Sequence, residues 1–225
     1  MKKLAVFMLA FAVMLGMGFS VEAAGHLDDG EYVGYSEADD NGYVQAVVNI
    51  EDHEITSVEL TEYTDLYLAK GEDYPWDEWH QAMDELPGMF REVDGPEVDI
   101  ISGATGTCEK AMEAVNQALM RSMGASSFDG TFMASSDASD RGNVGVAWVT
   151  VEDGNIVEVD LKETDGEGDF KGDEYDWDEF HEAKEELPER FIDANSPEVD
   201  IYSGATGSSN MWMQAVERAL EKAGL

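Results

Sequence analysis

The chain has 225 residues, with 50 Asp or Glu against 13 Lys or Arg and a formal net charge of −37 at pH 7. This charge repels nucleic acids and anionic lipids, and so excludes both as natural partners. The acidic residues are interspersed with aromatic and β-branched residues along the whole chain, which predicts a folded protein with an acidic surface. Such a surface suits a saline setting, where salt screens the self-repulsion.

Residues 1–23 have the pattern of a secretory signal peptide. Lys2 and Lys3 precede an apolar run over residues 4–21, and the small residue Ala23 stands at the expected cleavage site. An uncleaved membrane anchor is the alternative, because an apolar run of this length reaches the lower limit for spanning a bilayer. We therefore expect an extracytoplasmic protein, either secreted or held on the outer face of the cytoplasmic membrane.

The rest of the chain consists of two copies of one domain. Residues 71–90 match residues 172–191 at 11 of 20 positions, with an offset of 101 residues. A repeat of about 100 residues has the size of a small domain. The sequence predicts two tandem domains, over residues 27–122 and 128–225.

Each copy opens with the pattern of a β-hairpin. Residues 43–50 and 144–151 are rich in β-branched and aromatic residues, and turn-forming residues follow at 51–53 and 152–155. A second run then alternates apolar and polar residues, as a half-buried strand does. Its apolar members are Ile55, Val58 and Leu60 in the first copy and Ile156, Val159 and Leu161 in the second.

A helical pattern follows each hairpin. Apolar residues recur at spacings of three and four, which predicts an amphipathic helix. These residues are Trp76, Trp79, Met83 and Leu86 in the first copy, and Trp177, Phe180 and Leu187 in the second. Pro87 and Pro188 predict that the two helices end at the residue before each proline.

A short buried strand and a second amphipathic helix complete each copy. The strand is predicted from Val98, Ile100 and Ile101, and from Val199, Ile201 and Tyr202. The helix is predicted from Met112, Val115, Ala118 and Leu119, and from Met213, Val216, Ala219 and Leu220. Because strands come first and helices after, without βαβ alternation, we predict an α+β fold in which helices pack on an antiparallel sheet.

Before this last helix, both copies carry nearly the same stretch, PEVDIISGATG at residues 96–106 and PEVDIYSGATG at residues 197–207. A glycine turn at a helix N-terminus exposes unpaired N–H groups and the positive end of the helix dipole, which together suit a phosphate. The stretch lacks the Lys-Ser/Thr pair of a nucleotide P-loop and the GxSxG pattern of hydrolases. A simple helix cap is the alternative, but a cap needs only one residue.

The pattern Asp-x-x-Ser-Gly-Ala-Thr before an amphipathic helix resembles the covalent flavinylation motif of FMN-binding domains. This family includes the C subunit of the sodium-translocating NADH:quinone reductase, the G subunit of the Rnf complex and exported bacterial flavoproteins. In it, a flavin transferase moves FMN from FAD to the threonine hydroxyl as a phosphoester. The resemblance implies covalent FMN on Thr105 and Thr206. It assigns transferase recognition and phosphate seating to Asp99, Ser102, Gly103 and Ala104, and to Asp200, Ser203, Gly204 and Ala205.

The function implied by this resemblance is electron transfer by an exported flavoprotein with two covalent FMN groups. Electrons would pass from a membrane oxidoreductase to an extracytoplasmic acceptor, after maturation by a flavin transferase. No substrate pocket beyond the flavins is evident in the sequence, so we expect a carrier and not a complete enzyme. Two alternatives are a flavin-bearing component of a separate reductase of the fumarate-reductase kind, and an acidic binding module without redox activity.

A tryptophan and a histidine recur at the same positions in both copies, and they could line the flavin ring. These residues are Trp76 and His80 in the first copy, and Trp177 and His181 in the second. The alternative for the tryptophans is packing of the helix on the sheet. The alternative for the histidines is an exposed helix position that interacts with Asp84 or Glu185 four residues on.

Two further features of the sequence are expected to be structural. Cys108 is the only cysteine, and it is expected to be a small packing residue. Residues 165–176 resemble a calcium loop at three positions, but Phe170 stands where such a loop requires glycine, so we predict no metal site there.

Overall fold

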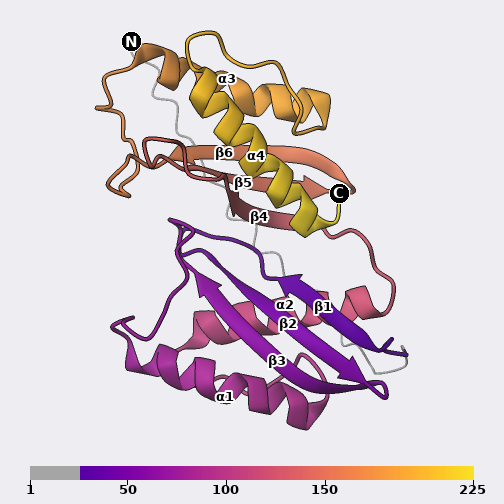
Figure 1. Cartoon of the computed structure of the whole chain (residues 1–225). Coiled ribbons are helices and arrows are strands. Elements are labelled where there is room, and N and C mark those ends of the chain that lie inside the picture. The colour runs from indigo at the N-terminus through magenta and orange to yellow at the C-terminus, as the bar shows by residue number, and fades with distance from the viewer. Residues whose placement is uncertain (1–25) are drawn as a thin grey trace, which may run out of the picture.

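The computed structural model describes residues 26–225, so the predicted signal peptide at 1–23 lies outside the described residues. The described chain forms two halves with the same order of elements (Figure 1). The first half contains β1 (Gly30–Tyr35), β2 (Tyr43–Glu51), β3 (Glu54–Tyr63), α1 (Asp77–Val93) and α2 (Thr105–Ser122). The second half contains β4 (Gly130–Ser135), β5 (Gly145–Glu152), β6 (Asn155–Glu163), α3 (Asp178–Ala194) and α4 (Thr206–Ala223).

Each half has a three-stranded antiparallel sheet with its strands in chain order. The predicted hairpins are β2–β3 and β5–β6. Each hairpin turns on two residues with positive φ, namely Asp52 (54°) and His53 (68°), and Asp153 (51°) and Gly154 (74°). Turns of this geometry match the twist of the flanking strands. The sequence prediction missed β1 and β4, which are only six residues long.

The helices of each half pack on the sheet of that half, as the predicted α+β fold requires. In the first half α2 packs on β1 and β2 while α1 packs on β3, and in the second half α4 packs on β4 and β5 while α3 packs on β6. Each half has its own apolar core between sheet and helices. Core residues include Val48, Leu86 and Val115 in the first half, and Val149, Leu187 and Val216 in the second.

The first helix of each half continues through its proline, so the prediction that it ends before the proline is wrong. Pro87 lies inside α1 and Pro188 inside α3. A proline inside a helix removes one backbone hydrogen bond and costs about 3 kcal/mol. The added turns bring Phe90 and Phe191 into the cores with 0% exposure. Burial of such a ring contributes about 1.5–3 kcal/mol, which offsets most of that cost.

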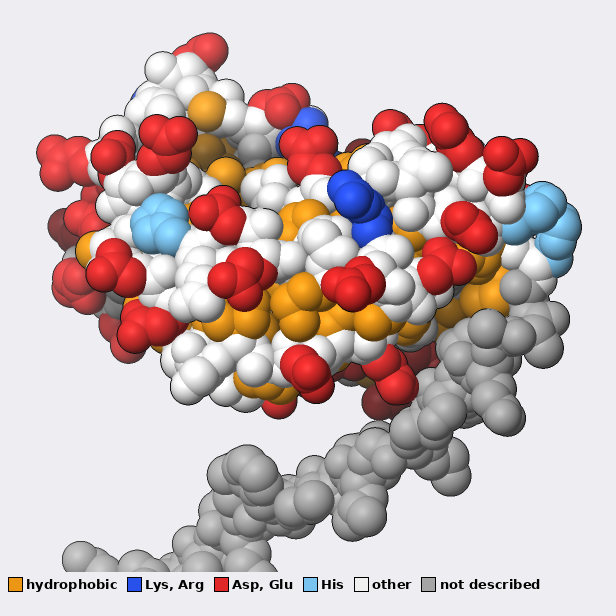
Figure 2. Space-filling model, turned by 90° about the horizontal axis from the view of Figure 1, so that it is seen from below, with side chains coloured by type: hydrophobic (Ala, Val, Ile, Leu, Met, Phe, Trp, Pro, Cys, Tyr) orange, Lys and Arg blue, Asp and Glu red, His pale blue; other side chains and the backbone are white. Residues whose placement is uncertain are grey.

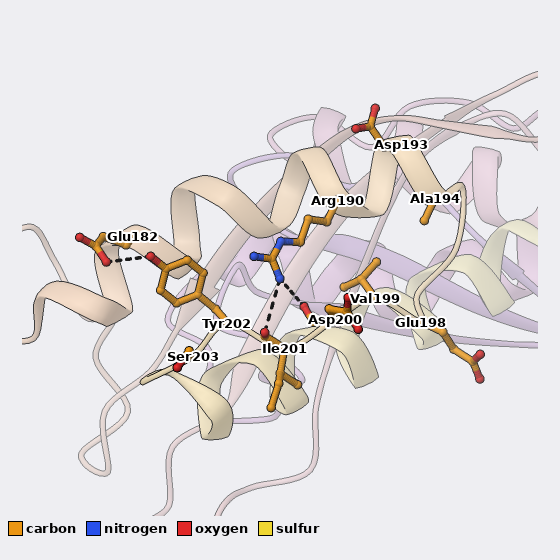
Figure 3. A pocket seen from close by; sticks show the side chains of 10 residues that line it. All are labelled: Glu182, Arg190, Asp193, Ala194, Glu198, Val199, Asp200, Ile201, Tyr202 and Ser203. Atoms are coloured by element: carbon orange, nitrogen blue, oxygen red, sulfur yellow. Dashed lines mark hydrogen bonds between the residues drawn. The ribbon is translucent and has the colours of Figure 1, made fainter.

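The segments before the two motifs are extended loops, so the predicted buried strands are also wrong. Neither segment pairs with a sheet, and Ile100 and Ile201 are 44% and 45% exposed. An apolar pattern forms a strand only where a neighbouring strand offers backbone partners. The segment before the second motif instead runs beside α3 (Figure 3).

The two halves share a buried interface. Tyr43 at the start of β2 clusters with Met133 of β4 and Trp148 of β5, and all three are less than 9% exposed. A backbone hydrogen bond also crosses the interface, because Ala38 N donates to Thr131 O at 2.8 Å. This face of the second sheet is therefore covered by the first half.

Lys222, near the end of α4, is buried in this interface. Its ammonium nitrogen lies 5.0, 3.8 and 4.9 Å from the ring centroids of Tyr35, Tyr43 and Tyr67, all from the first half. The same nitrogen donates to Met133 O at 2.6 Å. Burial lowers the pKa of Lys222 to about 7. A lysine of one half thus occupies an aromatic cage formed by the other.

The surface is acidic, as the composition requires. Figure 2 shows Asp and Glu side chains dispersed over one face of the molecule, with few Lys or Arg among them. Within residues 26–225, the helices are all too short or too polar to cross a membrane.

Candidate functional site

Each repeated motif forms a tight turn that ends at the first residue of a helix. Ala104 N donates to Ile101 O at 3.1 Å, and α2 begins at Thr105. The second copy repeats this geometry, since Ala205 N donates to Tyr202 O at 3.1 Å before α4 begins. Neither helix has a side-chain cap at its N-terminus.

The glycine before each alanine is required by the backbone. Gly103 has φ of +91° and Gly204 has φ of +93°, a region that residues with a Cβ rarely adopt. A Cβ on either glycine would also lie 2.7 Å from the Cγ atom of a glutamate, Glu78 in α1 and Glu179 in α3. The N-terminal turn of the preceding helix therefore packs directly on the motif.

The two threonines are exposed and stand at helix ends whose N–H groups are free. Within the described chain, no hydrogen bond involves the backbone N–H of the first three residues of α2 or of α4. Neither helix has an acidic residue in its first turn. A Cβ on Gly106 or Gly207 would meet no atom within 4 Å, so the space beside Thr105 and Thr206 is open. These features fit a phosphate group.

The remaining motif residues divide into exposed and buried positions. Asp99, Ser102, Asp200 and Ser203 are exposed. Both alanines, in contrast, have 0% exposure. A larger side chain at either alanine would therefore displace core residues.

A buried ion pair lies beneath the first motif. Glu62, the second-last residue of β3, pairs with Lys70 at 2.5 Å, and both side chains are less than 8% exposed. The other carboxylate oxygen of Glu62 accepts hydrogen bonds from Trp79 Nε1 at 2.8 Å and Thr107 Oγ1 at 2.9 Å. This carboxylate thus joins β3, α1 and α2 where both helices begin.

The second copy has the same pair with fewer partners. Glu163 pairs with Lys171 and accepts a hydrogen bond from Asn143 Nδ2 at 3.2 Å. Phe180 stands at the position of the tryptophan donor, and Glu163 Oε2 is buried without a hydrogen-bond partner among residues 26–225. Sequence reasoning missed both ion pairs, although the offset of 101 residues aligns their glutamates and lysines.

The tryptophans and histidines lie near the same helix ends. Trp76 precedes α1 and is 39% exposed, and the residue that packs this helix on the sheet is Trp79, which is 4% exposed. Trp177 is partly buried and stacks on Phe180, with ring centroids 6.3 Å apart. That any of these residues lines a flavin ring stays a prediction.

The two histidines bond to backbone and not to the carboxylates suggested by the sequence. His80 Nε2 lies 2.7 Å from Tyr74 O, and His181 Nε2 lies 2.7 Å from Tyr175 O. Because a carbonyl oxygen only accepts, each Nε2 carries a hydrogen. Each histidine therefore holds the loop that leads into its helix.

Cys108 holds the turn of the first motif through a hydrogen bond. Its buried sulfur accepts a hydrogen bond from Ile101 N at 3.4 Å. In the second copy, Ser209 Oγ accepts from Tyr202 N at 3.1 Å. The two side chains thus hold matching turns.

The loop that begins at Asp165 is held by its own backbone. Asp165 Oδ1 accepts hydrogen bonds from the N–H groups of Glu167, Gly168 and Asp169, which lower the pKa of this carboxyl group. Across the described residues, no three His, Cys, Asp or Glu side chains gather as metal ligands would.

A shallow groove of about 710 Å³ lies between α3 and the segment that leads into the second motif (Figure 3). Arg190 and Tyr202 face each other across it, with the guanidinium 5.7 Å from the ring centroid. Asp200 and Ser203 of the motif also line the groove. A hydrogen bond to Glu182 raises the pKa of Tyr202.

Comparison with known proteins gives one family. The model of the FMN-binding domain matches residues 41–120 and again residues 142–221, and each match contains one motif. A crystal structure of a protein from Clostridium perfringens is 28% identical, with 43% of this chain and 88% of that chain covered and a TM-score of 0.39. Among the curated proteins none matches the chain.

Proposed function

Because the chain belongs to the family of FMN-binding domains, with two copies in tandem, we propose that it is an exported electron-transfer flavoprotein. It carries two FMN groups, attached through their phosphates to Thr105 and Thr206. Electrons pass from a membrane oxidoreductase to an extracytoplasmic acceptor.

The observation that carries the proposal is the position of the two threonines, each exposed at the start of an uncapped helix. Each hydroxyl is exposed at the first residue of a helix that has no side-chain cap and no acid in its first turn. A phosphoester on this oxygen would lie against free N–H groups and the positive end of the helix dipole. The open space beside Gly106 and Gly207 leaves room for the phosphate.

The residues around the threonines have distinct roles in this proposal. The N–H groups of α2 and α4 hold the phosphate charge, which matters in a chain with so few cations. Gly103 and Gly204 let the turn approach the preceding helix without a steric clash. When bound, FMN supplies the redox chemistry, and the protein supplies attachment and electrostatics.

Covalent attachment of the flavin is useful to an exported protein. The leader pattern at residues 1–23 predicts export, and a dissociable flavin would be lost outside the cytoplasm. A flavin transferase is then the partner needed for maturation.

The test is the intact mass of the protein from its native host. We expect the mass of the polypeptide without residues 1–23 plus two FMN phosphoesters. Thr105→Ala and Thr206→Ala should each lose one increment, and the double variant should lose both. Thr56→Ala, which removes an exposed hydroxyl of β3 outside both motifs, serves as the control and should keep both increments.

A bare polypeptide from the native host would refute the proposed attachment. Co-purification of a catalytic subunit with the flavinylated chain would instead place the protein in a separate reductase.

A further inference from the structure

The segment before Thr206 is held by an arginine that has no counterpart in the first copy. Arg190 of α3 donates from Nη1 to Asp200 O at 2.5 Å and to Ile201 O at 3.4 Å. Its Nη2 bonds to Glu186 Oε1 at 2.5 Å, one helical turn earlier, which fixes the guanidinium in place. Figure 3 shows this side chain reaching from the helix to the loop.

Three more side chains tether the same segment. Ser196 Oγ accepts from Glu198 N at 3.1 Å, and Ser209 Oγ accepts from Tyr202 N at 3.1 Å. Tyr202 Oη donates to Glu182 Oε2 at 2.8 Å. Together with the arginine, these contacts bind the segment to α3 on one side and to α4 on the other.

The first copy has a different residue at the position of each tethering side chain and of Glu182. The offset of 101 residues places Met89 at the arginine, Gly95 at the first serine, Gln81 at the glutamate and Ile101 at the tyrosine. In the described chain, the single side-chain tether of residues 95–102 is the sulfur of Cys108. It is a weak acceptor, 3.4 Å from Ile101 N. The two acceptor segments therefore differ in how firmly they are held.

We propose that Arg190 is a positioning residue that makes Thr206 the faster of the two flavin acceptors. The inference rests on the proposed covalent attachment. In that step the hydroxyl oxygen of Thr206 bonds to the FMN phosphorus of FAD, the pyrophosphate bond breaks, AMP leaves, and the hydroxyl proton passes to water.

The physical reason is conformational entropy. A transferase must hold its acceptor segment in one conformation, and every residue that it orders on binding costs free energy. A segment that is ordered beforehand avoids part of this cost. Arg190 bonds two consecutive carbonyls of the motif. If this contact orders the equivalent of one residue before the transferase binds, Thr206 should be modified about tenfold faster.

The experiment follows modification at each threonine over time. The full chain, produced without flavin, is incubated with a flavin transferase and FAD, and the peptides that contain Thr105 and Thr206 are quantified by mass. We expect Thr206 to react about tenfold faster. Arg190→Met should slow Thr206 and leave Thr105 unchanged, whereas Met89→Arg should speed Thr105.

Lys184 provides a matched control on the same helix. The repeat aligns it with Met83, as it aligns Arg190 with Met89, and no hydrogen bond or ion pair of Lys184 is found in the described chain. Lys184→Met therefore makes the same change of charge without touching the segment. It should leave both rates unchanged.

Amide hydrogen exchange of the unmodified chain gives a second readout that does not need the flavin. Residues 196–203 should exchange more slowly than residues 95–102, and Arg190→Met should reduce this difference. If Arg190→Met does not fold, Met89→Arg still tests the same contact in the first copy.

Each outcome decides between the proposals. Equal rates at the two threonines, or equal effects of Arg190→Met and Lys184→Met, would overturn the positioning role. No modification at either threonine would overturn the covalent attachment itself, while the exchange comparison would still show whether Arg190 orders the segment.

Discussion

Replacing Lys222 with methionine should change how the stability of the protein depends on pH. The ammonium of Lys222 is buried among Tyr35, Tyr43 and Tyr67, and burial lowers its pKa to about 7 from the ordinary 10.5. The unfolded chain keeps the ordinary value, so between these two values it binds more protons than the native state. The free energy of unfolding of the wild type therefore rises with pH in this window.

The magnitude follows from the shift of the pKa. From pH 7 to pH 9, a lysine with a native pKa of about 7 contributes about 2 kcal/mol of added stability, and methionine contributes none. Burial raises the pKa values of Tyr35 and Tyr43, so these rings stay neutral in the window. The stability of Lys222→Met relative to the wild type should thus fall by about 2 kcal/mol as the pH rises from 7 to 9.

The assay is urea unfolding followed by tryptophan fluorescence at several pH values and constant ionic strength. Because the many carboxylates are common to both proteins, their effect cancels in the difference. A difference that stays constant from pH 7 to pH 9 would refute the reasoning. It would mean that the ring faces and the carbonyl oxygen of Met133 keep the ammonium charged as firmly as water does.

Three further substitutions test the site. Cys108→Ser should change the urea midpoint little, because serine holds the matching turn in the second copy, and a large loss of stability would reveal another role of the sulfur. Gly204→Ala should cost about 1–2 kcal/mol in the same assay, because alanine is strained at φ of +93°, so an unchanged midpoint would mean that the turn relaxes. Trp79→Phe should cost about 1–3 kcal/mol by taking a donor from the buried Glu62. Trp76→Phe is its exposed control, and equal effects of the two would contradict the role of the hydrogen bond.

Local patterns in the sequence were enough to predict the hairpins, the helices and the two copies. The apolar residues of β3, interleaved with polar ones, and the helical spacing of Trp79 and Leu86 are patterns of neighbours in the chain. Ile55, Val58, Trp79 and Leu86 are buried, as both patterns predict. The continuation of α1 through Pro87 was not predicted, because the local cost of the proline is largely offset by the burial of Phe90, which depends on the sheet below the helix.

The sequence by itself determined that a threonine follows a glycine turn at the start of a helix, and that this happens twice. Turn and helix signals are local, and the repeat confirms them at an offset of 101 residues. Only the tertiary structure decided which residues surround the turns. Glu62 accepts a hydrogen bond from Thr107, 45 residues away, and Arg190 of α3 donates to the backbone oxygen of Asp200 in the loop before α4. Such contacts depend on how sheets and helices pack in space, which no local pattern records.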